Sequence, residues 1–262
     1  MSYRTHKQPL GHATRGKTAA GRLRRLDRLL VVEAEALLRR PGGAFVDVGY
    51  GRLPTTTLES ARRFRAVRPD LLVIGLEIDP ERVEAARWAN DAITRFRRGG
   101  FELPLLPDER PVVVRAMNVL RQYPPDAVAD AHAQMLAKLA PGGLLAEGTS
   151  TPTGALMVVS LVRPGQPTEV VFSVNPRRIP ESPRAFAAVL PKDHIHRMVA
   201  GEPVHALLEA WEDAWSRTQP ASTFGPLAHW VAAGERLMER PDVVRRPGLL
   251  RKGYLLWRPV SS

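Results

Sequence analysis

The sequence contains no cysteine among its 262 residues. A chain without cysteine cannot form disulfides, hold zinc through thiolates or use a cysteine nucleophile. The sequence also lacks any run of 18 or more apolar residues, and no charged leader precedes a short apolar stretch. It therefore predicts neither a transmembrane helix nor a secretory signal. We expect a cytoplasmic protein with no membrane contact, whose chemistry depends on side chains other than thiols.

Acidic residues are also scarce, with 27 Asp and Glu against 38 Lys and Arg, and the net charge is +11. The excess is concentrated at the start, where residues 1–30 contain eight basic side chains and a single acidic one, Asp27. A basic segment attracts polyanions. One interpretation is therefore an arm, residues 1–18, that contacts RNA, and the other is that arginine simply fills solvent-exposed faces.

The middle of the sequence alternates between apolar strands and helical patterns. A helix is predicted over residues 19–40, and a Thr56-x-x-Glu59 capping box is predicted to start the helix after the first strand. The first predicted strand begins at Ala44. The other four cover residues 71–78, 94–97, 112–117 and 144–148. Connections of this length are too long for hairpins, so we expect a mostly parallel, doubly wound, Rossmann-like α/β sheet.

The last hundred residues break this alternation. Two β-rich runs, 156–162 and 168–174, are joined by a Pro- and Gly-containing turn and predict a hairpin. Helical patterns follow, and residues 253–257 predict a final strand. We therefore divide the chain into the arm 1–18, a core over 19–150, and 151–262, a hairpin and helical cap with a last strand for the core.

The most informative motif is the apolar run Phe45-Val46-Asp47-Val48 followed by Gly49-Tyr50-Gly51. Glycine has no Cβ and tolerates positive φ, so such a turn lets a ligand approach the backbone closely. Glu77 ends the next predicted strand, 28 positions after Gly49. A carboxylate there can bind two ribose hydroxyls. The pattern predicts a crevice that binds a nucleoside.

Two features of this motif count against a dinucleotide. The dinucleotide-binding fingerprint is Gly-x-Gly-x-x-Gly, whose third glycine allows close packing of helix on sheet. Here the corresponding residues are Gly49-Tyr50-Gly51-Arg52-Leu53-Pro54, so proline stands where the third glycine belongs. The acidic residue also comes later than the offset of about 20 positions that is usual in that fold.

Four segments in order resemble motifs of the class I S-adenosylmethionine-dependent methyltransferases, over residues 44–150. They are VDVGYG, GLEIDPERVEAAR, MNVLRQY and LAPGGLLAEGT. The resemblance implies S-adenosylmethionine as cofactor, no metal, and these binding roles. Gly49, Tyr50 and Gly51 would line its methionine and ribose side, Asp47 would orient the loop or the amino group, Glu77 would bind the ribose hydroxyls, Ile78 and Phe101 would contact adenine, and Asn118 would lie toward the methyl group.

The sequence says less about the methyl acceptor. A hydroxyl or protonated amine needs a base, for which His194 and His196 are the candidates. Methyltransferases that act on the amino groups of bases often carry a tetrad that ends in an aromatic residue. The corresponding segment here is Asn118-Val119-Leu120-Arg121, which has no aromatic residue, although Tyr123 lies close in sequence. We expect structured RNA slightly ahead of a small metabolite. Two other interpretations stay open, an NAD-dependent oxidoreductase and a non-catalytic nucleic-acid-binding protein. The sequence does not fix the oligomeric state.

Overall fold

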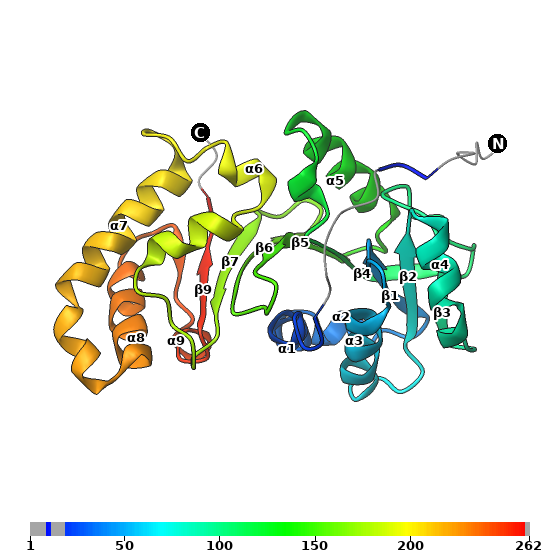
Figure 1. Ribbon diagram of the computed structural model, residues 1–262, viewed down its shortest axis with the longest axis horizontal. Helices are drawn as coiled ribbons and strands as arrows, with labels where there is room; N and C mark the ends of the chain where they lie inside the picture. Colours follow the sequence, from blue (N-terminus) through cyan, green and yellow to red (C-terminus); the bar gives the residue numbers. More distant parts are fainter. Residues whose placement is uncertain (1–8, 12–18, 260–262) are drawn as a thin grey trace. The chain divides into compact units, whose positions relative to one another are not determined.

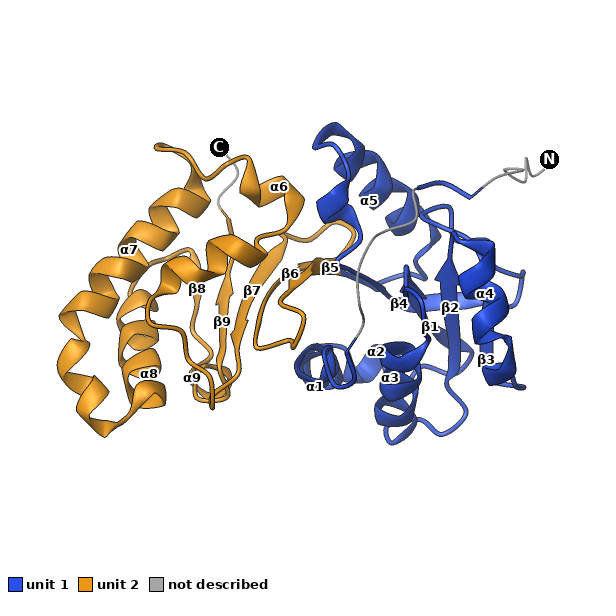
Figure 2. Cartoon of the chain, in the orientation of Figure 1, with its two compact units in different colours: residues 1–146 blue, residues 147–262 orange. Residues whose placement is uncertain are grey.

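A computed structural model describes residues 9–11 and 19–259 of the chain. The chain divides into two compact units, residues 1–146 and residues 147–262 (Figure 2). Most of the predicted basic arm, residues 1–8 and 12–18, lies outside the described residues. None of the described helices combines the length and apolar character that crossing a membrane requires.

The first unit contains the predicted parallel sheet. Its strands lie in the order β3-β2-β1-β4-β5, and the pairs β1–β2, β1–β4 and β2–β3 are all parallel. Every residue of β1 is buried, as expected of a strand covered on both faces. The strands are β1 (Gly43–Val48), β2 (Leu72–Glu77), β3 (Thr94–Arg98), β4 (Arg110–Met117) and β5 (Leu144–Ser150), which continues into the second unit.

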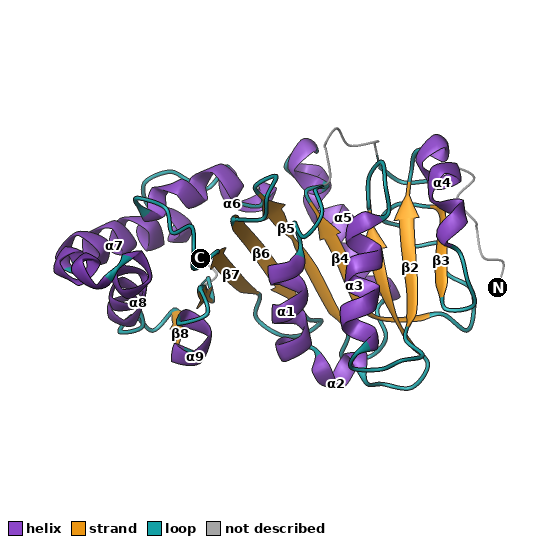
Figure 3. Cartoon of the chain, turned by 60° about the horizontal axis from the view of Figure 1, so that its bottom comes forward, coloured by secondary structure: helices purple, strands orange, loops and turns teal. Residues whose placement is uncertain are grey.

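Helices cover both faces of these strands. Figures 1 and 3 show α1 (Arg24–Glu33) and α3 (Thr55–Arg65) on one face and α5 (Asp126–Lys138) on the other. This arrangement confirms the doubly wound, Rossmann-like fold. The remaining elements of this unit are α2 (Glu35–Leu38), α4 (Pro80–Ala86) and the 3₁₀ turns η1 (Arg87–Ala89) and η2 (Leu120–Gln122).

The structure corrects two local predictions. The helix predicted over 19–40 is broken at Ala34, whose φ is −130°, and the break buries Leu38 while Leu37 stays partly exposed. The predicted capping box is wrong as well, because α3 starts at Thr55 without a side-chain cap. The Glu59 carboxylate instead accepts hydrogen bonds from the backbone N–H of Gly21, at 2.9 Å from each oxygen.

The second unit is antiparallel. Its strands β6 (Leu156–Val162) and β7 (Glu169–Val174) form the predicted hairpin, and the strand order is β6-β7-β9-β8. The final strand β9 (Tyr254–Trp257) pairs with β7 and with β8 (Val243–Val244), all within this unit. The other elements are η3 (Pro183–Val189), α6 (Lys192–Ile195), α7 (Pro203–Arg217), η4 (Gln219–Phe224), α8 (Pro226–Leu237) and α9 (Pro247–Leu250).

An aromatic cluster forms the core of the second unit. Trp211 of α7 is fully buried and stacks on Phe186 at 5.3 Å between ring centroids. Phe172 of β7 meets the Trp211 ring edge-on at 5.4 Å, and Trp230 of α8 lies 5.3 Å away. Rings of this size contribute much of the buried apolar area of a small unit. Trp211 therefore packs the core between helix and strands.

Candidate cofactor-binding site

The site begins with the bend that follows β1. Gly49 and Gly51 both have positive φ, 71° and 83°, a region that side chains disfavour and glycine tolerates. The N–H of Gly49 donates to the carbonyl of Leu76 at 2.8 Å, which ties the bend to the end of β2. A Cβ on Gly49 would lie 2.6 Å from Cγ2 of Val119. Both conformation and space therefore require glycine at this position.

Glu77 faces this bend from the end of β2. Its Oε2 accepts a hydrogen bond from the N–H of Gly51 at 2.9 Å, and its Oε1 accepts from the N–H groups of Ile78 and Asp79 at 2.9 and 3.3 Å. The guanidinium of Arg82 lies 3.6 Å from Oε2. The side chain is only 2% exposed, so these donors compensate the cost of burying its charge.

A cavity opens between the bend and Glu77. It encloses about 270 Å³, including solvent at its mouth, and lies where the strand order reverses between β1 and β4. This switch point at the carboxyl ends of parallel strands is where open α/β sheets bind ligands. Four residues that the sequence singled out line the cavity, namely Gly49, Glu77, Ile78 and Phe101.

Tyr50 and Asn118 lie beside the cavity and do not line it. The Tyr50 ring packs edge-on against Phe96, at 5.1 Å between centroids. Burial raises the pKa of Tyr50, and the nearby carboxylates of Glu77 and Asp47 raise it further, so the phenol stays protonated. Asn118 follows β4 with φ at 62°, a conformation that asparagine tolerates better than most residues.

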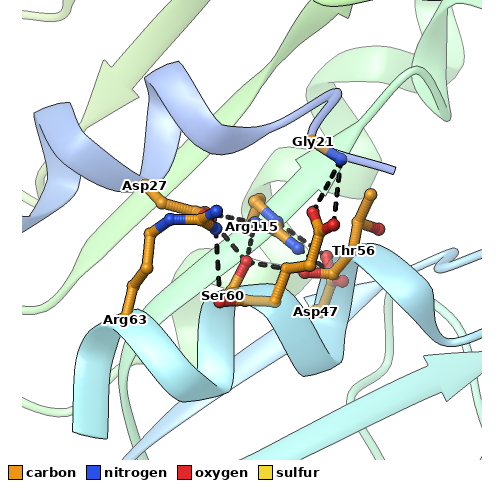
Figure 4. A network of polar contacts seen from close by, with 8 residues as sticks. Gly21, Asp27, Asp47, Thr56, Ser60, Arg63 and Arg115 are labelled. Atoms are coloured by element: carbon orange, nitrogen blue, oxygen red, sulfur yellow. Dashed lines mark hydrogen bonds and ion pairs between the residues drawn. The ribbon is translucent and has the colours of Figure 1, made fainter. Parts of the chain in front are cut away.

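Asp47 is turned into a buried polar network behind the bend (Figure 4). Arg115 of β4 donates from Nε and Nη2 to the two carboxylate oxygens, at 2.9 and 2.7 Å. The hydroxyl of Thr57 donates to Oδ2 at 2.6 Å. Because Thr57 belongs to α3, Asp47 connects the end of β1 to the helix that follows the glycine bend.

The network continues from Arg115 to α1. Arg115 Nη1 donates to Oδ1 of Asp27 at 2.8 Å and to the hydroxyl of Ser60 at 2.7 Å. Arg63 Nη1 donates to the other oxygen of Asp27 at 2.6 Å. Two guanidiniums thus balance Asp27 and Asp47. Burial by itself lowers the pKa of Arg115, but the two carboxylates outweigh it, so its pKa is raised and the group stays charged.

Sequence reasoning missed several residues of the site. Tyr123 lines the cavity, with its ring 5.3 Å from that of Phe101. Tyr123 is the last residue of the MNVLRQY motif, but sequence reasoning gave it no role in binding the cofactor. Gly99 and Gly100 also line the cavity, and two adjacent glycines ahead of Phe101 were the visible sign. Leu10 completes the wall together with Gly11, and no sequence pattern pointed to either.

The two candidate histidines belong to the second unit. His194 is buried beside Trp257, at 5.8 Å between ring centroids, whereas His196 is exposed. Burial lowers the pKa of His194 and Arg197 lowers it further, while Asp193 opposes the shift. Among the described residues that line the cavity there is no histidine. The described part of the chain also has no group of three His, Asp or Glu side chains arranged to hold a metal ion.

No family model and no curated protein matches the sequence. Solved structures that are similar include a protein of Thermobifida fusca YX assigned to the methyltransferases, 26% identical over 49% of this chain and 53% of that chain, with a TM-score of 0.36. Another is human N-acetylserotonin methyltransferase with S-adenosylmethionine, at 17% identity, 49% and 36% coverage, and a TM-score of 0.33. A third is the plantazolicin methyltransferase with S-adenosylhomocysteine. It is 12% identical over 50% of this chain and 48% of that chain, with a TM-score of 0.39. The chain thus spans about half the length of the first of these.

Proposed function

We propose that this protein binds S-adenosylmethionine in the cavity at the carboxyl ends of β1 and β2 and transfers the methyl group to an acceptor. The observation that carries the proposal is the Glu77 carboxylate facing the Gly49–Gly51 bend, 2.9 Å from the N–H of Gly51. This pairing of a carboxylate with two glycines, which have no side chains, fits a ribose with two adjacent hydroxyls.

Each part of the cavity has a role in holding this ligand. Glu77 accepts hydrogen bonds from the ribose hydroxyls, and the bend admits the methionine part along the backbone. Ile78 and Phe101 contact the adenine. Asp47 orients the bend through Thr57, since the buried Arg115 guanidinium engages both of its oxygens. The bound cofactor supplies a methyl group on a positively charged sulfur, and the chain contributes by aligning the acceptor in a site with little water.

The charge of the cavity favours a sulfonium over a pyrophosphate. Glu77 is the one charged side chain among the described residues that line it, so the wall carries a negative charge. A dinucleotide instead needs donors from a helix N-terminus. Pro54 occupies the N-cap of α3, and proline has no N–H to donate. Both features argue against an NAD-dependent oxidoreductase.

The acceptor is the less constrained part of the proposal. An RNA acceptor rests on the basic residues of the first 30 positions, and most of the arm lies outside the described residues. A small metabolite needs no such arm. Incubating the protein with cell extract and labelled S-adenosylmethionine, then counting label separately in RNA, protein and small molecules, identifies the acceptor class.

Calorimetric titration tests the cofactor assignment. The wild-type protein should bind S-adenosylhomocysteine and not NADH. Glu77→Gln should weaken the binding by roughly tenfold to a hundredfold, since a hydrogen bond to a charged group is worth about 1.5–3 kcal/mol. The control is Glu84→Gln on α4, whose side chain is 70% exposed and pairs only with Arg87 in the described structure.

Circular dichroism of both variants establishes that they are folded before their affinities are compared. Binding of NADH by the wild-type protein, with no binding of S-adenosylhomocysteine, would overturn the assignment. An equal affinity of the wild type and Glu77→Gln for S-adenosylhomocysteine would remove Glu77 from the site.

A further inference from the structure

Residues Pro9–Gly11 form a short strap, in which Leu10 and Gly11 line the cavity. Two backbone groups of Leu10 hold it in place. The carbonyl of Leu10 accepts a hydrogen bond from the N–H of Phe101 at 3.2 Å, and the N–H of Leu10 donates to Oε2 of Glu102 at 2.9 Å. The strap is drawn in dark blue above the arrowhead of β2 in Figure 1. One backbone–backbone bond and one bond to a side chain therefore tie the strap to the turn after β3.

Two glycines allow the strap to lie this close. A Cβ on Gly100 would collide with the carbonyl oxygen of Leu10. A Cβ on Gly11, whose φ is 131°, would lie 2.6 Å from the hydroxyl oxygen of Tyr123 and 3.4 Å from the Phe101 ring. The backbone of Gly11 thus lies against aromatic side chains with no room for a side chain of its own.

The strap lies on the side chains that the proposed function assigns to adenine. The Cβ position of Gly11 is 3.6 Å from Cδ1 of Ile78 and 3.4 Å from Phe101, and both residues line the cavity. With the strap in place the cavity encloses about 270 Å³. Because this figure counts open solvent, the room that protein atoms enclose is smaller than 270 Å³, whereas sites of drug-sized ligands usually have roughly 300–1,000 Å³. An adenosine joined to an amino acid needs more room than the strap leaves.

We infer that the strap is an autoinhibitory element: Leu10 and Gly11 occupy the adenine position of the ligand-free protein, and the cofactor must displace them to bind. This inference rests on the proposed function. Within the described part of the chain, two hydrogen bonds of 2.9 and 3.2 Å hold the strap, which stabilise its closed state only modestly. A ligand that binds only the open state loses apparent affinity in proportion to the closed population. Releasing the strap should therefore tighten binding.

The variant Gly11→Ala tests this without changing any side chain that contacts the ligand. The added Cβ meets the Tyr123 hydroxyl and should release the strap. We expect S-adenosylhomocysteine to bind Gly11→Ala roughly tenfold more tightly than it binds the wild type. This is the factor expected when the closed state is stabilised by one or two net hydrogen bonds. The matched control is Gly42→Ala, at φ 70° with no atom within 4 Å of its Cβ position, which should leave the affinity unchanged.

A second measurement reports on the strap with no cofactor present. The N–H of Phe101 is bonded to the Leu10 carbonyl, so hydrogen exchange of the segment around Phe101 should be faster in Gly11→Ala than in the wild type. Leu10→Pro, which removes the N–H that Glu102 accepts, should give the same acceleration.

The outcomes separate the two proposals. Unchanged or weaker binding of S-adenosylhomocysteine by Gly11→Ala, with exchange at Phe101 accelerated, would overturn the autoinhibitory role and leave the proposed function standing. Weaker binding in particular would identify the strap as a lid over the bound ligand. Absence of binding by the wild type and by both variants would overturn the proposed function itself, and the autoinhibitory role with it.

Discussion

Replacing Arg115 with methionine should destabilise the first unit strongly. Arg115 is fully buried and bonds Asp47 and Asp27 at distances of 2.7–2.9 Å. Methionine fills a similar volume but donates no hydrogen bond. Two carboxylates would then lie in the core, with Asp47 keeping only Thr57 and Asp27 keeping Arg63 and Ser60.

The expected loss of unfolding free energy is about 3–5 kcal/mol, the usual cost of removing one partner from a buried ion pair. The matched control is Arg39→Met on the surface. Arg39 pairs with Glu35 four residues earlier, and both side chains are at least half exposed. Such exposed pairs within a helix contribute about 0.3–0.5 kcal/mol. The structure thus predicts a difference of roughly tenfold in energy between two substitutions of the same chemistry.

Urea titration followed by far-UV circular dichroism measures both losses. Because the chain has two compact units, a single transition is not assured. Hydrogen exchange of the β1 and β4 amides should therefore be measured as well, since these strands lie in the first unit. A loss below about 1 kcal/mol in Arg115→Met, with exchange in β1 unchanged, would refute the view that this network stabilises the sheet.

Two further predictions concern the bend and the buried histidine. Gly49→Ala should cost the strain of about 1–2 kcal/mol for a side chain at positive φ plus the contact with Val119, so its loss of unfolding free energy should exceed that of Gly42→Ala, and Val119→Ala should restore part of it. Equal losses in the two glycine variants would contradict the contact. Because burial lowers the pKa of His194 in the folded state, stability should be complete above the ordinary histidine pKa of about 6.5 and fall as the pH drops through the folded pKa. The fall in melting temperature between pH 7 and pH 5 should be smaller in His194→Gln than in the exposed control His196→Gln, and identical slopes would contradict it.

Most of the fold could be predicted because its signals are local. Apolar runs separated by helical patterns identified all five strands of the first unit within a few residues, and the pair 156–162 and 168–174 identified the hairpin. The break at Ala34 was missed because the apolar periodicity continues through it. The role of Glu59 was missed because its partner, the N–H of Gly21, lies 38 positions away. Local sequence says nothing about such a distant competitor.

The residues of the site could likewise be predicted only where their signal is local. Gly49 and Glu77 were predicted from the local pattern of strand, glycine bend and acidic strand end, and Ile78 from the family resemblance; all three line the cavity. Leu10 and Gly11 reach the cavity from about 90 positions away, where the Leu10 backbone bonds to the Phe101 N–H and the Glu102 side chain after β3. Backbone contacts between distant segments leave no residue pattern, so sequence reasoning had no means of finding them.

The contrast between Asp47 and Glu77 shows what decides the role of a carboxylate at this edge of the sheet. Both residues end or nearly end a buried strand and lie beside the same bend. The family resemblance implied that Glu77 binds the ribose hydroxyls and that Asp47 orients the loop or the amino group. The register of the sheet separates them. Asp47 of β1 is the direct partner of Arg115 on β4, so adjacent parallel strands bring a carboxylate and a guanidinium together on one face.

Glu77 is the direct partner of Arg98 on β3, but the Arg98 side chain is exposed and its Nε donates to the carbonyl of Ile78. The Glu77 carboxylate is held by hydrogen bonds from the N–H groups of the bend and of its own turn, while the Arg82 guanidinium stays 3.6 Å from Oε2, too far for a hydrogen bond. Hydroxyls of a ligand can replace such backbone donors more easily than they can replace a buried guanidinium. Glu77 is therefore the carboxylate suited to exchange its partners, and Asp47 is the one that keeps them.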